Sequence, residues 1–378
     1  MNKMSNKPMR KTNLTLKMLN NLLLDLPAPM NLSIMWNWGS LLSFMLIIQI
    51  LTGSLLAMHY TPHILLAYDM MIHIMNNINM GWVIRLIHVN GASMYFIFLY
   101  MHMGRNMYYH LYSNKLVWYI GYTIFLLSMM TAFMGYILPW GQMSLWGATV
   151  ITNMFSTIPY LGGSMVQWIW GGYSVGNPTL NRFFVLHFML PFIILLLVMN
   201  HIMYLHKSGS SNPLGVNSSL MKIPFHPYYS SKDLFLIIIM MVMMSFIFML
   251  NPNLFMDSEN MIEANFMKTP IHIKPEWYFL WLYAMLRSIP NKLGGVVTMA
   301  MALIILLLLP MISKYNHLFF MSAFNKFLFW LMILNFMLLT WIGNMAVLPI
   351  FQLLGLFSTI LYFLLMFLYL LLPVYFKL

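Results

Sequence analysis

The amino-acid sequence predicts an all-α polytopic membrane protein with eight transmembrane helices. Of its 378 residues, 61% are hydrophobic and only 7% are charged, whereas about a quarter of a soluble domain is charged. The apolar residues gather in runs of about 20, the length that a helix needs to cross a bilayer. A net charge of +12 would suggest nucleic acid in a soluble protein. Here the charges lie between apolar runs, so we expect no nucleic-acid partner.

Eight runs meet the length and composition of a membrane span. The fifth and seventh are short and the last is long. In chain order they are Trp36–Met58, Trp82–Met103, Leu116–Leu138, Phe183–Leu205, Leu234–Leu250, Val296–Ser313, Phe327–Ile342 and Pro349–Tyr375.

Other apolar segments are too short or too interrupted to span. Leu14, Met18 and Leu22 recur at helical spacing among polar residues, which predicts an amphipathic helix lying on the membrane. Pro139–Val175 is broken by many Gly and Pro residues, and Trp277–Leu286 is apolar for about ten residues only. Irregular backbone at membrane depth has to be buried in protein or line a cavity.

The distribution of Lys and Arg predicts the orientation. With eight spans both termini lie on one side, and six of the 19 basic residues fall on the other side, which leaves thirteen with the termini. This asymmetry places the termini on the negative side of the membrane. The six are Arg85, Arg182, Lys268, Lys274, Arg287 and Lys292.

Four histidines stand in two equally spaced pairs. The second span contains His88 and His102, and the fourth contains His187 and His201. An interval of 14 residues advances a helix by roughly 21 Å and returns to nearly the same face. Two such helices facing each other would form two sites of two imidazoles each, one above the other. A lone histidine in a membrane span could instead only bind a neighbouring helix.

The same interval of 14 residues separates two glycines in each of the first and third spans. The pairs are Gly39 with Gly53, and Gly121 with Gly135. A residue without a side chain leaves room for a flat macrocycle against the backbone. The four pairs together predict a four-helix bundle that encloses two b-type haems, each with two histidine ligands. We expect this bundle in residues 1–210, with the amphipathic helix, and a C-terminal four-helix region in 211–378.

Three arginines lie near the membrane ends of these sites, where haem propionates would emerge. Arg85 precedes His88 by three residues, Arg105 follows His102 by three, and Arg182 precedes His187 by five. Each could instead only set the topology. The chain has no cysteine, so it cannot provide thiolate ligands for haem or for an iron–sulfur cluster.

Several continuous motifs carry a resemblance to a known family. From about Met9 to the C-terminus the chain resembles mitochondrial cytochrome b of the cytochrome bc complex, respiratory complex III. The unsplit chain and equal histidine spacings favour this respiratory type over the chloroplast counterpart. Trp38, Pro178, Trp281 and Leu282 depart from the family pattern. The motifs are Pro139–Ser144, Trp146–Asn153, Pro275–Tyr278 and Arg287–Lys292.

The resemblance implies roles for further residues. His88 and His187 would bind the low-potential haem near the positive side, and His102 and His201 the high-potential haem near the negative side. The quinol-oxidation pocket would use Tyr136, Gly147, Pro275, Glu276, Tyr278 and Phe279. The quinone-reduction pocket would use His206, Ser210, Lys232 and Asp233, with Trp36 and Asn37 nearby.

The resemblance also implies a function and partners. The chain would be the core subunit of the quinol–cytochrome c oxidoreductase, which oxidises ubiquinol on the positive side. Electrons would pass through the two haems to quinone on the negative side, coupled to proton translocation. Expected partners are a Rieske-type iron–sulfur protein, a cytochrome c-type haem subunit, other complex III subunits and a second copy in a homodimer. The expected location is the mitochondrial inner membrane, with both termini in the matrix.

The residues support some of these roles independently of the resemblance. Glu276 stands in an aromatic, apolar loop, where burial raises a carboxyl pKa as a proton acceptor for quinol requires. A His–Asp pair from His206 and Asp233, with Lys232, could deliver protons to a reduced quinone. Two alternatives remain open, a transporter with histidine proton relays and a haem-bearing membrane anchor without a quinol pocket.

Overall fold

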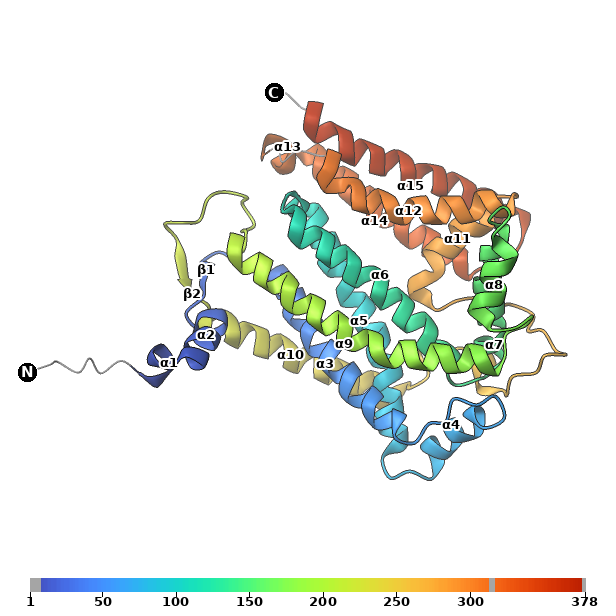
Figure 1. Ribbon diagram of the computed structural model, residues 1–378. Coiled ribbons are helices and arrows are strands. Elements are labelled where there is room, and N and C mark those ends of the chain that lie inside the picture. Colours follow the sequence, from blue (N-terminus) through green and yellow to red (C-terminus); the bar gives the residue numbers. More distant parts are fainter. Residues whose placement is uncertain (1–7, 313–316, 376–378) are drawn as a thin grey trace, which may run out of the picture.

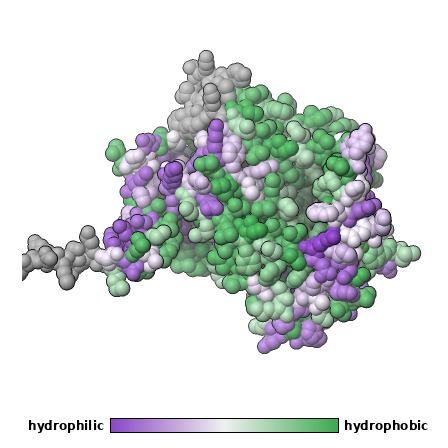
Figure 2. All heavy atoms as spheres, in the orientation of Figure 1, coloured by the Kyte–Doolittle hydropathy of each residue, from purple (hydrophilic) through white to green (hydrophobic). Residues whose placement is uncertain are grey.

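The computed structural model describes residues 8–312 and 317–375, and its regular structure is almost entirely helical. Eight of the described helices are long and apolar enough to cross a membrane, and they run side by side in two groups (Figure 1). On the face in Figure 2, hydrophobic residues cover the middle and hydrophilic residues gather toward both ends. The predicted all-α fold with eight spans is therefore confirmed.

The eight long helices correspond one to one to the predicted spans. Helices α9 and α10 begin earlier than predicted, because an apolar window detects only the part of a helix that lies in hydrocarbon. Ser313, the predicted end of the sixth span, lies outside the described residues. The helices are α3 (Trp38–Ala57, after the 3-10 turn η1, Ile34–Asn37), α5 (Gly81–Tyr108), α6 (Lys115–Ile137), α9 (Asn177–Ser208), α10 (Phe225–Leu250), α12 (Lys292–Ile312), α14 (Ala323–Asn344) and α15 (Pro349–Tyr375).

The first four spans form the predicted bundle. Helix α3 packs on α5, α6 packs on α9, and α3 also contacts α9. Helix α10 packs against α3 and α5, so it lies with the first group although it follows residue 210. The short helix α11 (Leu280–Ser288) contacts α12, α14 and α15 in the second group. One apolar cluster joins both groups, and the boundary at residue 210 stays a prediction.

Short helices fill the interrupted segments at one end of the molecule (Figure 1). The segment Pro139–Val175 folds into helices too short to span, as do the residues before the second span. Glycine at position 171 has a φ of 75° and ends α8, a conformation that a side chain disfavours. These elements are α4 (Ala67–Asn76), α7 (Gln142–Thr152), η3 (Asn153–Thr157), α8 (Gly162–Trp170), η4 (Ser258–Met261) and η5 (Trp277–Phe279).

The opposite end holds the N-terminal elements. Helix α2 (Leu14–Leu23) leaves Leu14 and Met18 exposed, and the side chain of Asn13 caps it by accepting from two backbone N–H groups. Strand β1 (Pro27–Pro29) pairs antiparallel with β2 (Lys222–Pro224), which ties this end to the start of α10. The remaining elements here are α1 (Met9–Thr12), η2 (Leu111–Ser113) and α13 (His317–Met321).

Candidate functional site: paired histidines and a shared cavity

The four expected histidines meet in two pairs between α5 and α9. The ring centroids of His88 and His187 are 6.2 Å apart, and those of His102 and His201 are 6.3 Å apart. A metal–imidazole bond of about 2 Å on each side, added to about 1 Å from each ring centre to its nitrogen, gives a separation near 6 Å. Both pairs therefore fit a single ion held between two imidazoles.

A glycine of a neighbouring helix lies behind each imidazole. A Cβ added to Gly53 would lie 3.0 Å from Cε1 of His88, and one added to Gly135 would lie 2.3 Å from Cε1 of His187. The other two separations are 3.1 Å from Gly121 to His201 and 3.4 Å from Gly39 to His102. Helix α3 thus backs the histidines of α5, and α6 backs those of α9.

Hydrogen bonds shorter than 3 Å orient two of the rings, and a longer contact of 3.5 Å joins Nη2 of Arg105 to Nδ1 of His102. Nδ1 of His187 lies 2.8 Å from the carbonyl oxygen of Thr131, which can only accept, so Nδ1 carries the proton. Nδ1 of His88 lies 2.9 Å from the hydroxyl of Thr52. Engaging Nδ1 leaves Nε2 as the available ligand atom. Neither threonine was predicted from the sequence, although Thr131 precedes Gly135 by four residues and so shares its face.

One cavity of about 260 Å³ joins the first histidine pair to the expected quinol residues. His88 and His187 line it with Gly53 and Gly135. Tyr136, Glu276 and Tyr278 line the same space, as does Asp257. The structure therefore brings the expected electron-carrying site and the expected proton acceptor to a single apolar cavity.

Two of the three expected arginines are placed to bind anions. Arg85 lines the cavity, is buried, and has one terminal nitrogen without a hydrogen-bond partner. Arg105 is also buried with its Nε unpartnered, and its guanidinium lies 5.1 Å from the ring centroid of Trp36. A buried guanidinium nitrogen without a partner is costly unless an anion meets it. Both therefore fit a carboxylate ligand such as a haem propionate.

The structure does not bring Arg182 to the cavity, contrary to expectation. Its side chain is exposed, and it donates to the backbone carbonyls of Trp168 and Ile169 at the end of α8. The spacing explains this difference, because a residue five positions before His187 lies roughly 140° around the helix from it. Arg85, three positions before His88, is only about 60° away.

Glu276 lines the cavity at the residue that precedes η5. Its Oε1 is buried and has no hydrogen-bond partner. Burial raises the pKa of Glu276 to about 8, and the negative charge of Asp257 adds to this rise. With this pKa, roughly a tenth of the Glu276 carboxyl groups are ionised at pH 7 and about half at pH 8, so the group can both accept and release a proton in this range. Pro275 and Phe279 do not line the cavity but lie next to Glu276 and Tyr278 in the chain. Gly147 does not line it either, and an added Cβ there would meet no atom within 4 Å.

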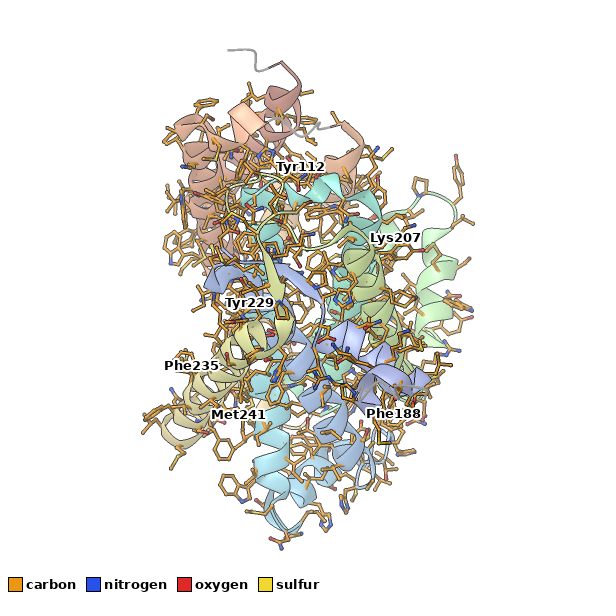
Figure 3. The ribbon with its side chains drawn as sticks, turned by 90° about the vertical axis from the view of Figure 1, so that its left-hand side faces the viewer. Tyr112, Phe188, Lys207, Tyr229, Phe235 and Met241 are labelled. Atoms are coloured by element: carbon orange, nitrogen blue, oxygen red, sulfur yellow. The ribbon has the colours of Figure 1, made fainter. Side chains whose placement is uncertain are left out.

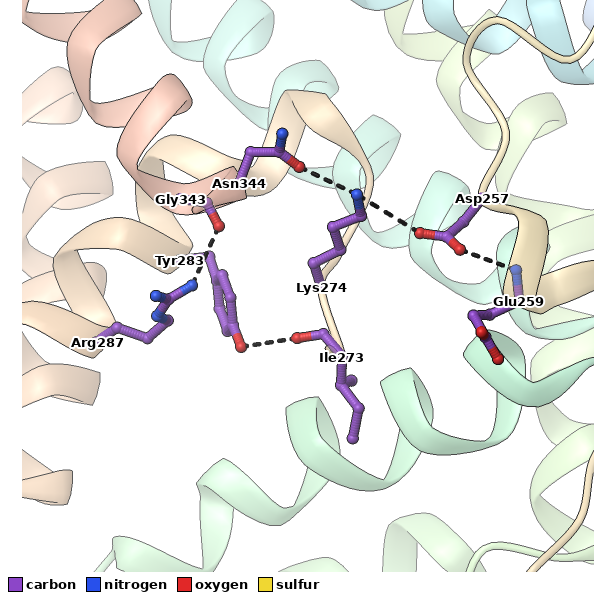
Figure 4. A network of polar contacts seen from close by, with 8 residues as sticks. All are labelled: Asp257, Glu259, Ile273, Lys274, Tyr283, Arg287, Gly343 and Asn344. Carbon is purple, nitrogen blue, oxygen red and sulfur yellow. Dashed lines mark hydrogen bonds and ion pairs between the residues drawn. The ribbon is translucent and has the colours of Figure 1, made fainter. Parts of the chain in front are cut away.

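Polar contacts hold the part of the loop that precedes Glu276 (Figure 4). Nζ of Lys274 lies 3.1 Å from Oδ1 of Asn344 and 3.7 Å from Oδ2 of Asp257. The hydroxyl of Tyr283 donates to the carbonyl of Ile273 at 2.9 Å. Ile273 and Lys274, which both precede Glu276, are thus tied to α11, α14 and the segment before η4.

The expected quinone-reduction residues form two separate groups at the opposite end. His206 and Ser210 line a second cavity of about 170 Å³, together with Lys207 and Lys222. Asp233 instead accepts hydrogen bonds from Asn37 and Ser40. No hydrogen bond or ion pair joins His206 to Asp233 within the described residues.

Lys232 and Trp36 accompany the second of these groups. Nζ of Lys232 donates to the carbonyl of Leu32 at 2.8 Å, just before η1. Nε1 of Trp36 is buried without a hydrogen-bond partner. Figure 3 views this end and shows Tyr229, Phe235 and Met241 in succession along α10, with Lys207 near the end of α9.

Comparisons with known proteins agree with this geometry. Residues 23–209 match the family described as "Cytochrome b/b6/petB", and residues 263–363 match "Cytochrome b(C-terminal)/b6/petD". The chain is 66% identical over 362 residues to the cytochrome b of Myzostoma seymourcollegiorum, covering 96% of each. A chain of a solved hyperthermophilic respiratory Complex III superposes with a TM-score of 0.88 at 32% identity, covering 96% of this chain and 97% of that one.

Proposed function

The chain belongs to the cytochrome b family, and we propose that its paired imidazoles hold two b-type haems. His88 with His187 forms one site and His102 with His201 the other. The chain is a core subunit of respiratory complex III, the quinol–cytochrome c oxidoreductase, and binds b-type haem. A haem with two histidine ligands carries one electron at a time and has no open position for oxygen. The observation that carries the proposal is the pair of centroid separations near 6 Å.

Quinol oxidation takes place in the cavity beside His88. The apolar walls exclude water, and the carboxylate of Glu276 accepts a proton from the quinol hydroxyl. Its pKa of about 8 lets it take this proton near neutral pH and release it afterwards. Tyr136 and Tyr278 line the space next to this carboxylate, and Pro275, Phe279 and Gly147 complete the predicted pocket. The buried Arg85 binds a haem propionate.

Quinone reduction takes place at the opposite end. His206 and Ser210 bind one part of the quinone, and Asp233, held by Asn37 and Ser40, binds another. In this proposal the two groups bind different oxygens of one quinone ring. Lys232 supplies protons next to Asp233, Arg105 binds the second haem's propionate, and Trp36 borders the site.

Partners supply the remaining redox centres. A chain without cysteine cannot ligate an iron–sulfur cluster, so a Rieske-type protein accepts the other electron of quinol and a cytochrome c-type subunit follows it. The complex is a homodimer with further complex III subunits. It lies in the mitochondrial inner membrane, with both termini in the matrix, as the distribution of Lys and Arg favours.

A redox-titrated optical spectrum of the complex, compared with that of His187→Leu, tests the haem assignment. The wild type should show two b-type components, and the variant should lose one of them. A normal two-component spectrum in this variant would contradict the haem assignment.

Family membership excludes the transporter alternative, and Glu276→Gln tests the haem-anchor alternative. The Glu276→Gln variant should oxidise quinol more slowly and keep both haems, whereas in a haem-bearing anchor this substitution would leave the rate unchanged.

A further inference from the structure

Helix α5 presents a second face beside the one that carries His88. Ser93, Phe96 and Tyr100 follow the spacing i, i+3, i+7, which places them on one side of the helix. Tyr100 lies 12 positions after His88, roughly 120° around the helix axis. The same helix therefore offers His88 and, turned from it around the axis, this three-residue face, of which Ser93 and Phe96 line the same cavity as His88.

This face contacts the two residues that directly follow Glu276. The indole Nε1 of Trp277 donates to the hydroxyl of Ser93 at 3.2 Å. The ring of Tyr278 stacks on Phe96, with centroids 4.1 Å apart and planes 6° apart. The hydroxyl of Tyr100 donates to the backbone carbonyl of Tyr278 at 2.6 Å. Three different contacts thus fix two consecutive residues of the loop.

A tryptophan of α11 completes the contact. Nε1 of Trp281, on α11, donates to the hydroxyl of Tyr100 at 3.1 Å. This hydroxyl therefore accepts one hydrogen bond and donates another, so it has a defined direction. The rings of Tyr100 and Trp281 also both pack on Phe336, at 5.2 and 5.5 Å between centroids.

Within the described residues no hydrogen bond joins the carboxyl group of Glu276 to another residue; its Oε1 is buried without a partner, and the side chain does not cap η5. Its direction has to come from the backbone on either side. We propose that Ser93, Phe96 and Tyr100 are positioning residues, which hold the loop so that Glu276 points into the cavity it shares with His88. This inference rests on the proposed role of Glu276 in quinol oxidation.

The physical reason for using α5 is that a helix is a rigid spacer. Ser93 lies five residues beyond His88, about 7.5 Å along the axis. Because one helix carries both the imidazole and the loop's anchor, the carboxylate and the haem site cannot drift apart independently. A displacement of about 1 Å at a reacting group can cost roughly 100-fold in rate.

The test uses Tyr100→Phe in the intact complex, with quinol as substrate. The variant keeps the ring and loses the hydroxyl bonded to Tyr278 and Trp281. We expect kcat to fall roughly tenfold, while KM changes less than about threefold, because the cavity walls that bind the quinol are unchanged. Both b-haem components should keep their wild-type amplitudes. Ser93→Ala should also lower kcat, but its KM does not discriminate, because Ser93 itself lines the cavity.

Tyr122→Phe is the matched control. It removes a tyrosine hydroxyl that donates to the carbonyl of Leu303 at 3.2 Å, away from the loop, and should leave kcat at the wild-type value. An unchanged kcat in Tyr100→Phe overturns the proposal, and so does a parallel loss of haem, which indicates a structural role. Glu276→Gln separates the two hypotheses. If it slows the reaction and Tyr100→Phe does not, only the positioning role fails, and if neither slows it, the proposed function fails.

Discussion

Alanine at the four glycines behind the histidines should damage the haem sites in an order set by distance. An added Cβ at Gly135 would lie 2.3 Å from Cε1 and 2.7 Å from Nδ1 of His187. To regain a carbon–carbon separation near 3.5 Å, the imidazole has to withdraw by roughly 1 Å. Ligand distances in metal sites hold to within about 0.2 Å, so this displacement breaks the ligation.

The other three substitutions should be progressively milder. The added Cβ would lie 3.0 Å from the ring at Gly53, 3.1 Å at Gly121 and 3.4 Å at Gly39. The last value is an ordinary contact, whereas overpacking at a rigid site costs about 1–3 kcal/mol. We therefore expect the loss of b-haem to be greatest for Gly135→Ala, intermediate for Gly53→Ala and Gly121→Ala, and smallest for Gly39→Ala.

Redox-titrated spectra of the intact complex, with the haem content per chain, would measure this order. Gly163→Ala is the matched control, since a Cβ there meets nothing within 4 Å and alanine favours a helix. Gly135→Ala should lose the component assigned to His88 and His187 and keep the other. If Gly39→Ala lost more haem than Gly135→Ala, or both components fell together, the reasoning from these distances would be refuted.

Three further predictions follow from the same structure. The rate of quinol oxidation should rise with pH through about 8, because Glu276 accepts a proton only when ionised and its pKa is about 8. Glu276→Gln should lower the rate roughly 100-fold and abolish this rise with pH. Arg85→Leu should weaken retention of the haem held by His88, measured as haem per chain, whereas Arg182→Leu should not. Lys274→Met should change the free energy of unfolding by no more than about 1 kcal/mol in denaturant titrations, because Lys274 and its partner Asp257 are 33% and 17% exposed.

The meeting of the four histidines in two pairs could be predicted from the sequence because their spacing is set within single helices. An interval of 14 residues fixes the relative depth and direction of His88 and His102 whatever surrounds them. The fold class followed for a similar reason, since span length depends on local composition. Which glycine lies behind which histidine depends on how α3, α5, α6 and α9 pack, and only the structure shows it.

Features that depend on distant contacts could not be predicted. Trp277 and Ser93 are 184 residues apart, and no periodicity in either segment indicates that they meet. The expected role of Arg182 rested on closeness in sequence, which ignored its direction around α9. The expected pairing of His206 with Asp233 assumed that adjacent helix ends meet, whereas Asp233 is held by Asn37 and Ser40 of the first span.

The cavity collects polar groups that the fold would be more stable without. Oε1 of Glu276, a terminal nitrogen of Arg85 and Nε2 of Gln49 all belong to residues that line it, and all are buried without partners. Each such group costs about 1–3 kcal/mol. Local violations of this kind persist where function requires them. A carboxylate that has to exchange a proton with a transient substrate cannot have a permanent partner, so its position has to be fixed through the backbone, as the contacts of Trp277 and Tyr278 with α5 allow.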